Sequence, residues 1–323
     1  MIPNLVSIVI PTYNRKDIID ETINSALGQT YQNIEVIILD NNSDDGSYNY
    51  LKKKYQTNRN VAVYSNESTL DIVKNWRKCF EYANGEYVHI LWSDDLISPE
   101  FILRTLDFLE SNPEAGFVYT KTAIFDNDSG ISKTVFNLDQ SGLIEKSVFI
   151  EKSLLGMPLS VPVSPANALF RRNDVDKNLL IDIPNNFGVE FSKLGQGNDC
   201  LLFLLSLNHY SHFGYLDEEL AFFRAHSNSI TLSTDSFLVT FRYHLAKAYF
   251  VSLAQLDMKL IKRFNSKSLV LTLLGVCLGK GKMLSIPKLY TSNVNTTVDY
   301  PYVLVVLANY LRHGIIKLKL TLF

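Results

Sequence analysis

Short apolar runs alternate with segments of helical periodicity over the first 120 residues of this 323-residue chain. The runs predict five buried strands, at Leu5–Ile10, Ile34–Leu39, Val61–Tyr64, Glu86–Trp92 and Gly116–Thr120. Helical spacing between them predicts helices at Asp17–Gln29, Gly46–Tyr55 and Leu70–Ala83, and a fourth that Ser98-Pro99 opens as N-cap and first residue. Strands without a polar face, separated by helices, predict an α/β fold: a mostly parallel sheet flanked by helices on both faces.

The pattern is less regular after Thr120. It predicts a hairpin around Asn127–Gly130, a loop at Pro184–Asn198, a helix at Asp199–Leu207, and two short strands at Phe213–Leu216 and Leu220–Phe223. From Ser236 onward the apolar spacing is again helical. We therefore expect one domain over residues 1–235 and a mainly helical, basic C-terminal region over residues 236–323.

Charge divides the chain in the same way. From Thr240 to the end there are 12 Lys and Arg residues but only two acids, Asp257 and Asp299, so this part carries about +10 and the first 239 residues about −12. The negative charge of the first 239 residues argues against a nucleic acid partner. The basic, apolar tail fits an anionic membrane surface or a packed helical appendage with solvated lysines, and the sequence leaves both open.

Cysteine usage and the N-terminus bear on the compartment. The three cysteines lie far apart without a C-x-x-C motif, which indicates buried thiols in a reducing compartment. The first residues lack the basic start of a signal peptide, and the longest apolar runs are shorter than the roughly 20 residues that span a bilayer. We expect a cytoplasmic protein; if the tail binds membrane, it would lie on the inner face of the plasma membrane.

Polar clusters follow three of the predicted strands, at Pro11–Arg15, Asp40–Gly46 and Ser93–Asp95. Parallel sheets of this kind bind ligands outside the carboxyl ends of their strands, so these clusters predict one binding site. The chain has no G-x-x-x-x-G-K-[ST] and no G-x-G-x-x-G after the first strand. A bound nucleotide would therefore depend on a divalent metal held by carboxylates instead of a glycine cradle.

Each polar cluster also has a purely structural interpretation. Asp94 and Asp95 could cap the next helix, but adjacent carboxylates repel each other and Ser98-Pro99 already supplies a cap, which favours metal binding. Asp40 could accept a hydrogen bond from a base or simply begin a turn. Tyr13 could stack on a base or fill the rim of the site.

Four blocks, taken together, resemble family-2 glycosyltransferases of the GT-A fold, which is Rossmann-like. They are Val9–Arg15, Ile38–Ser43, Ala83–Tyr87 and Ser93–Asp95, in this order and at this spacing. The resemblance covers residue 4 to about residue 232 and includes an Arg-x-His at Arg224–His226. The blocks are similar to those of bacterial O-antigen and capsule enzymes, including abequosyltransferase-like ones.

The resemblance implies a role for each matching position. Pro11, Tyr13 and Asp40 would line the base pocket, Asp94 would face the ribose or metal, Asp95 would be the main ligand of Mn²⁺ or Mg²⁺, His226 would contact metal or diphosphate, and Asp199 would be the catalytic base. A lone His is also a common structural residue, and Asp199 also fits an N-cap. Two positions depart from the family: Trp92 and Asn198 stand where relatives often carry acids.

The function that this implies is inverting transfer of a sugar from a nucleotide-diphosphate sugar to an acceptor glycan, in surface polysaccharide synthesis. The acceptor is lipid-linked in many relatives. Two alternatives stay open at this point. Trp92 and Asn198 are compatible with a non-catalytic subunit of a polysaccharide assembly complex. A nucleotidyltransferase would share the architecture and the metal, but it needs a basic glycine loop after the first strand, which residues 11–16 do not provide.

Overall fold

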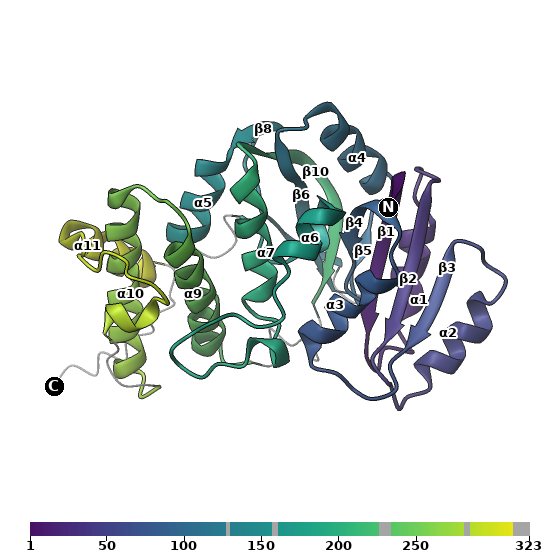
Figure 1. Ribbon diagram of the computed structural model, residues 1–323, viewed down its shortest axis with the longest axis horizontal. Helices are drawn as coiled ribbons and strands as arrows, with labels where there is room; N and C mark the ends of the chain where they lie inside the picture. The colour runs from purple at the N-terminus through teal and green to yellow at the C-terminus, as the bar shows by residue number, and fades with distance from the viewer. Residues whose placement is uncertain (127–129, 157–160, 226–233, 281–284, 313–323) are drawn as a thin grey trace.

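The computed structural model describes residues 1–126, 130–156, 161–225, 234–280 and 285–312, and Figure 1 shows their arrangement. Its strands are β1 (Ile2–Thr12), β2 (Ile34–Asp40), β3 (Val61–Ser65), β4 (Gly85–Ile90), β5 (Leu96–Ile97), β6 (Ala115–Asp126), β7 (Gly130–Val135), β8 (Gly142–Glu145), β9 (Ala168–Arg171) and β10 (His212–Arg224). Its helices are α1 (Ile19–Leu27), α2 (Ser47–Tyr55), α3 (Ile72–Tyr82), α4 (Phe101–Ser111), α5 (Lys146–Leu155), α6 (Arg172–Asn178), α7 (Asn198–Ser206), α9 (Ser236–Leu253), α10 (Met258–Cys277) and α11 (Tyr300–Arg312). Single 3-10 turns are η1 (Pro165–Asn167), η2 (Phe191–Lys193), η3 (Leu207–His209) and η4 (Ile286–Leu289).

The strands form one mixed, mostly parallel central sheet in the order β3-β2-β1-β4-β9-β6-β10-β5, with β7 beside β6 and β8 beside β10. The four strands β3, β2, β1 and β4 are parallel neighbours, and β6 pairs with β10 in parallel. The short strand β9 lies antiparallel between β4 and β6 and joins these two parallel groups. The predicted fold class is therefore confirmed.

Helices cover both faces of the sheet because side chains alternate along each strand. In β1, Val6, Ile8 and Ile10 belong to the hydrophobic cluster that also contains the buried faces of α1, α2 and α4. Val9 belongs to the opposite cluster, which contains the buried residues of α3 and α7. The nearly all-apolar strands of the sequence are apolar because both faces are packed.

One predicted helix start is wrong. Helix α4 begins at Phe101 with Glu100 as its N-cap, not at Ser98-Pro99. Leu96 and Ile97 instead form β5, which pairs with β10, and the Ser98 N–H donates to the Leu220 carbonyl at 2.8 Å. This pairing keeps the backbone extended through residue 98, so the helix cannot begin until the following turn is complete.

The second half of the sheet differs from the sequence prediction in two ways. The short strands predicted at 213–216 and 220–223 are parts of one long strand, β10, and β9 was not predicted at all. Strand β9 has only four residues, and it is stabilised by hydrogen bonding to neighbours on both sides. The turn of the predicted hairpin, 127–129, lies outside the described residues, but β6 and β7 on either side of it pair antiparallel.

The C-terminal helices pack beside the sheet domain, and α7 lies between the sheet and α9 in Figure 1. Leu245 and Phe250 of α9 and Phe264 of α10 belong to the same hydrophobic cluster as the β1 residue Val9.

The division at residue 235 stays a prediction. Within the described ranges, each helix is either too short or too polar to cross a membrane.

Candidate active site

The carboxyl ends of β1, β2 and β4 meet at one edge of the sheet. The register pairs Thr12 with Asp40 and Val9 with Ile90, so the polar clusters that follow these strands are neighbours. Asn14 and Asn42 have φ values of 51° and 63°, in the left-handed region that Asn tolerates well. These turns reverse the chain immediately after β1 and β2 and hold their polar residues at this edge.

The predicted base-binding residues lie at this edge. Asp40 is fully buried; one carboxylate oxygen accepts from the Ser43 Oγ at 2.6 Å and the other from the Ser43 N–H at 2.8 Å. Pro11 is buried in β1, whereas the Tyr13 side chain is 46% exposed. Tyr13 is thus accessible to a planar ligand, and Asp40 is rigidly oriented beside it by the turn that it closes.

Asp94 and Asp95 follow β4 and precede β5, so they are too far from α4 to cap it. Asp95 is 6% exposed and accepts a hydrogen bond from the Arg224 N–H at 3.0 Å. The Arg224 guanidinium donates to the Asp94 carbonyl at 2.9 Å and forms an ion pair with Glu21 at 2.8 Å. Arg15 approaches the Asp94 carboxylate at 3.8 Å. The turn after β1 and strand β10 therefore both contact this pair of acids.

The electrostatics of the pair fit a cation. Burial, and secondly the negative charge of Asp94, raise the pKa of Asp95 well above its usual range. A divalent cation would relieve both effects, and Mg²⁺ commonly takes one or two protein carboxylates together with phosphate oxygens. The described residues contain no cluster of three or more His, Cys, Asp or Glu that would hold a metal by itself. His226, the other predicted metal residue, lies outside the described residues.

Tryptophan 92 has a structural role at the position where relatives often carry an acid. Its indole N–H donates to the Ser164 Oγ at 2.7 Å, and its ring packs on Trp76 of α3 with centroids 4.5 Å apart. Trp76 in turn packs so closely on Gly195 that a Cβ there would lie 2.4 Å from the ring. Gly195 also has a φ of 71°. This stack connects the Asp94-Asp95 segment to the segment that leads into α7.

Asp199 lies in the first turn of α7, one residue inside the helix start, so it is not the N-cap; that position belongs to Gly197. One of its carboxylate oxygens accepts from the N–H groups of Gly197 and Cys200, at 2.9 and 2.8 Å. The other accepts from the Tyr243 hydroxyl of α9 at 2.8 Å. The side chain is 8% exposed. Three donors thus hold a carboxylate that burial would otherwise disfavour.

Burial is the largest influence on Asp199 and raises its pKa to about 6, although the hydrogen bonds from Gly197, Tyr243 and Cys200 act in the opposite direction. A carboxylate with a pKa near 6 is ionised at neutral pH and still basic enough to accept a proton from a reacting hydroxyl. Perturbed carboxyl groups of this kind are concentrated at functional sites.

Asn198, the second departure from the family pattern, anchors the loop before α7. Its amide donates to the carbonyls of Leu180 and Ile181 at 2.8 and 3.2 Å, and the side chain is fully buried. A glutamate here would place a negative charge against two carbonyl oxygens. The asparagine is therefore explained by packing and hydrogen bonding.

Sequence reasoning did not identify two residues as parts of the site. Arg224 was noted only as part of an Arg-x-His motif, and Tyr243 was treated as part of a separate helical region. The motif pointed toward Arg224, which binds Asp95 through its backbone and Asp94 through its side chain. No sequence signal marks Tyr243, because its contact with Asp199 depends on how α9 packs on α7.

Comparison with known proteins decides the family. A sequence profile described as "Glycosyl transferase family 2" matches residues 7–179, which is more than half of the chain. The chain belongs to glycosyl transferase family 2. The matched region includes the polar clusters after β1, β2 and β4, so this glycosyltransferase carries the family's pattern at the edge of the sheet described above.

Curated relatives of this chain include named glycosyltransferases. It is 37% identical over 108 residues to the Escherichia coli UDP-Glc:alpha-D-GlcNAc-diphosphoundecaprenol beta-1,3-glucosyltransferase WfaP, over 33% of this chain and 42% of that one. It is 30% identical over 124 residues to the putative teichuronic acid biosynthesis glycosyltransferase TuaG of Bacillus subtilis, over 38% of this chain and 49% of that one. Both matches span less than half of the relative.

A solved structure confirms the GT-A fold. The crystal structure of Staphylococcus aureus TarS 1-349 in complex with UDP-GlcNAc matches with a TM-score of 0.63 at 18% identity, over 95% of this chain and 80% of that one. The match extends beyond the region of the family profile and includes most of the C-terminal helices. At this identity the likeness concerns the fold alone.

The environment of Asp199 leads to a first prediction. Replacing Tyr243 with Phe removes a donor to the ionised carboxylate, so the pKa of Asp199 should rise by about one unit from its value near 6. Titration of the ¹³C-carboxyl resonances measures the pKa of Asp199, and the Asp199→Asn variant identifies its signal. Tyr249→Phe, on the same helix, should leave it unchanged. A wild-type pKa near 4, or equal values in all variants, would contradict the assignment.

Proposed function

We propose that this glycosyltransferase uses a divalent metal to transfer a sugar, with inversion, from a nucleotide-diphosphate sugar to a hydroxyl group of an acceptor glycan. The observation that carries the proposal is Asp199: a buried carboxylate, held by three donors, with a pKa raised to about 6. The Trp76 ring packs on Gly195, in the segment before Asp199, and on Trp92, in the segment that bears Asp94 and Asp95.

The donor would lie across the carboxyl ends of the strands. Pro11, Tyr13 and Asp40 would form the base pocket, with the exposed Tyr13 ring stacking on the base. Asp94 would face the ribose. Asp95 and His226 would contact a Mn²⁺ or Mg²⁺ ion, and such an ion would offset the negative charge of the departing diphosphate.

Asp199 would act as the general base. As the acceptor hydroxyl oxygen forms its bond to the anomeric carbon, its proton moves to the Asp199 carboxylate, and the bond from the anomeric carbon to the diphosphate oxygen breaks. The nucleoside diphosphate leaves with the electron pair. Attack from the face opposite the leaving group inverts the anomeric centre. Tyr243 would keep the carboxylate oriented, since its hydroxyl donates to the second oxygen.

The setting would be assembly of a surface polysaccharide such as O-antigen or capsule. WfaP is named for an acceptor linked to diphosphoundecaprenol, and TuaG for teichuronic acid synthesis. A lipid-linked acceptor of that kind would place this protein in the cytoplasm, at the inner face of the plasma membrane. The net charge of about −12 in the first 239 residues disfavours nucleic acid as a ligand. An abequosyltransferase-like choice of sugar stays a prediction of the sequence.

The non-catalytic alternative loses its main support. It depended on Trp92 and Asn198. Trp92 donates a hydrogen bond to Ser164 and packs on Trp76, and Asn198 donates to two backbone carbonyls. Both departures therefore have packing reasons that leave Asp95 and Asp199 in place.

A thermal-shift screen tests the donor and metal sites. UDP, dTDP, GDP and CMP are added with and without Mn²⁺; one of them should raise the melting temperature by a few degrees only when metal is present, because a ligand that binds the native state stabilises it. Asp95→Ala should lose this shift, and Asp107→Ala on the exposed side of α4 should keep it. If no nucleotide stabilises the wild type, the donor site is refuted.

Turnover tests the base. With the nucleotide sugar chosen by that screen, Asp199→Asn should lower kcat by about 10²- to 10⁴-fold while nucleotide binding is retained. Glu110→Gln, an exposed acid of α4, serves as the matched control and should be fully active. Proton NMR of the product should show the anomeric configuration opposite to that of the donor. Retained configuration, or full activity of the asparagine variant, would rule out this mechanism.

We further propose that the basic C-terminal region associates with anionic membranes. Leu311 and Arg312 lie at its described end, and Lys317 and Lys319 lie outside the described residues. Each lysine near an anionic surface contributes about 1 kcal/mol, so reversing Lys317 and Lys319 to Glu should weaken co-sedimentation with phosphatidylglycerol vesicles at least about tenfold. The control variant that carries Lys52→Glu and Lys53→Glu in α2 should co-sediment with the vesicles as strongly as the wild type. Wild-type protein that stays in the supernatant would show that this region is only a packed appendage.

A further inference from the structure

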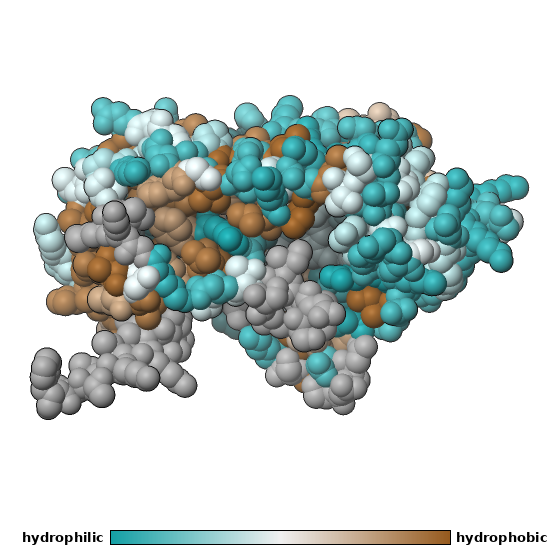
Figure 2. Space-filling model, turned by 90° about the horizontal axis from the view of Figure 1, so that it is seen from below, coloured by the Kyte–Doolittle hydropathy of each residue, from teal (hydrophilic) through white to brown (hydrophobic). Residues whose placement is uncertain are grey.

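An apolar hollow on the described surface lies between the loop before α7 and the C-terminal helices. It has a volume of about 450 Å³, within the range of small-molecule sites. Aromatic and aliphatic side chains form most of its lining, among them Phe187, Leu194, Phe237 and Phe241. We call it the α9 groove. Figure 2 shows apolar surface gathered on the side of the molecule that carries the C-terminal helices.

The aromatic floor of the α9 groove is built by close packing. Phe241 contacts Phe187 edge-on with ring centroids 5.7 Å apart and is nearly parallel to Phe237 at 6.3 Å. A Cβ at Gly275 of α10 would lie 2.7 Å from the Phe237 ring, so only glycine lets the helix approach so closely. Leu238 at the rim remains 40% exposed. The floor is thus preformed, and part of its apolar surface is open to a ligand.

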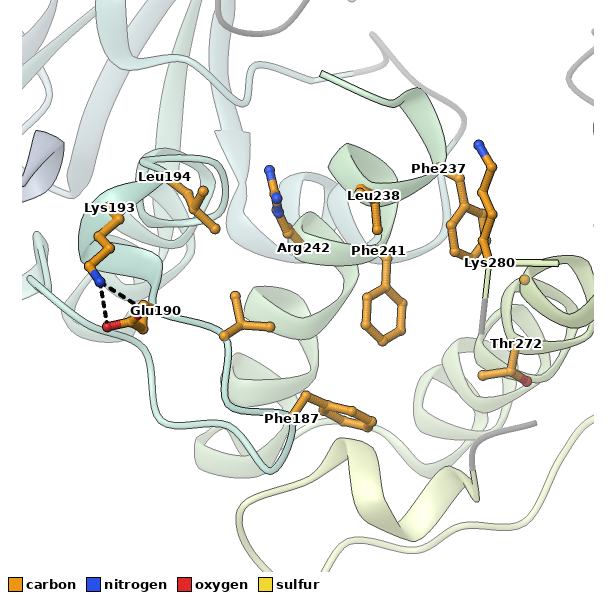
Figure 3. A pocket seen from close by; sticks show the side chains of 12 residues that line it. Phe187, Glu190, Lys193, Leu194, Phe237, Leu238, Phe241, Arg242, Thr272 and Lys280 are labelled. Carbon is orange, nitrogen blue, oxygen red and sulfur yellow. Dashed lines mark hydrogen bonds and ion pairs between the residues drawn. The ribbon is translucent and has the colours of Figure 1, made fainter. Parts of the chain in front are cut away.

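Cationic side chains line the same groove. They are Lys193, Arg242 and Lys280. Lys193 is paired with Glu190 and Lys280 with Asp235. Arg242 instead donates to the neutral side chain of Gln196 at 2.6 Å, and no acid among the described residues pairs with its charge. In Figure 3, Arg242 points away from the facing rings of Phe187 and Phe241, so the groove has an apolar part and a cationic part.

A buried donor without a partner lies next to Arg242. Gln196 is only 4% exposed, and its amide nitrogen has no hydrogen-bond partner among the residues that the structure describes. An unpaired buried donor costs free energy, and this one is enclosed by protein outside the lining of the groove. Gln196 precedes Asp199 by three residues, and Arg242 precedes Tyr243, which binds Asp199. Arg242 is therefore linked to the candidate base in two ways: its chain neighbour Tyr243 binds Asp199, and its partner Gln196 lies three residues before Asp199.

We propose that the α9 groove binds the diphosphate and the adjoining hydrocarbon of a polyprenyl-diphosphate-linked acceptor. Arg242 contacts the diphosphate, and Phe187, Phe237, Phe241 and Leu238 pack on the first isoprene units. The acceptor sugar, attached to the other end of the diphosphate, then lies toward Asp199. The hydrocarbon and the diphosphate of such an acceptor match the apolar part and the cationic part of the groove. The inference rests on the proposed function and specifies its acceptor.

Calorimetric titration with farnesyl diphosphate tests the groove directly. EDTA is present, so that metal-mediated binding at Asp94 and Asp95 is excluded. Wild-type protein should bind farnesyl diphosphate at least about tenfold more tightly than inorganic diphosphate or farnesol, because only the whole molecule engages both parts of the groove. Equal affinity for farnesyl diphosphate and farnesol would overturn the role of Arg242.

Paired variants locate the binding. Leu238→Asp places a negative charge at the exposed rim and should weaken farnesyl diphosphate at least about tenfold, whereas Leu304→Asp, at a 69% exposed leucine of α11, should not. Arg242→Gln should weaken it, and Lys259→Gln on the exposed surface of α10 should not. Melting temperatures verify that each variant is folded. If the groove variants bind as well as their controls, the groove is not the site.

Nucleotide binding separates this inference from the proposed function. The groove variants should keep the metal-dependent stabilisation by nucleotide, since their side chains lie outside the edge of the sheet formed by β1, β2 and β4. If the wild type binds nucleotide but not farnesyl diphosphate, the groove inference fails and the proposed function stands. If farnesyl diphosphate binds but no nucleotide does, the proposed donor site fails instead.

Discussion

The parallel pairing of β1 with both β2 and β4 is the constraint on which the rest of the site depends. Hydrogen bonding in register places Thr12 opposite Asp40 and Val9 opposite Ile90, so residues 28 and 81 positions apart in the sequence end at one edge. Because both faces of these strands are covered by helices, the strands cannot slip without exposing apolar side chains. The edge is consequently a rigid platform, and the polar turns after each strand become the candidate nucleotide and metal site.

A balance between burial and hydrogen bonding governs the candidate base. Burial raises the pKa of the Asp199 carboxyl, whereas the N–H groups of Gly197 and Cys200 and the Tyr243 hydroxyl stabilise its ionised form, and the resulting pKa is about 6. Tyr243 belongs to α9, outside the region of the family profile. The C-terminal helices are therefore part of the electrostatic environment of the site as well as part of the hydrophobic packing.

Departures from a family pattern need a structural explanation before they are read as loss of activity. Trp92 and Asn198 replace acids, yet each makes contacts that an acid could not make: an indole packed on Trp76, and an amide that donates to two carbonyls. Trp76 and Gly195 then connect the two regions in which these residues lie. The same packing links the acidic pair after β4 to the segment before Asp199, which a change at either position would disturb.

The sequence by itself determined the α/β class, the strands β1 to β4 and the polar clusters after them, because apolar periodicity and turn residues are local properties. The polar cluster after β4 also identified Asp94 and Asp95 as candidates, and the resemblance to family-2 glycosyltransferases identified Asp199. Only the tertiary structure decided the start of α4 at Phe101, the insertion of β9 between β4 and β6, and the contact of Tyr243 with Asp199. Each of these depends on hydrogen bonds or packing between segments distant in the chain, which no local pattern encodes. The α9 groove belongs to the same class, since its floor exists only where Phe187, Phe241 and Gly275 from three separate segments meet.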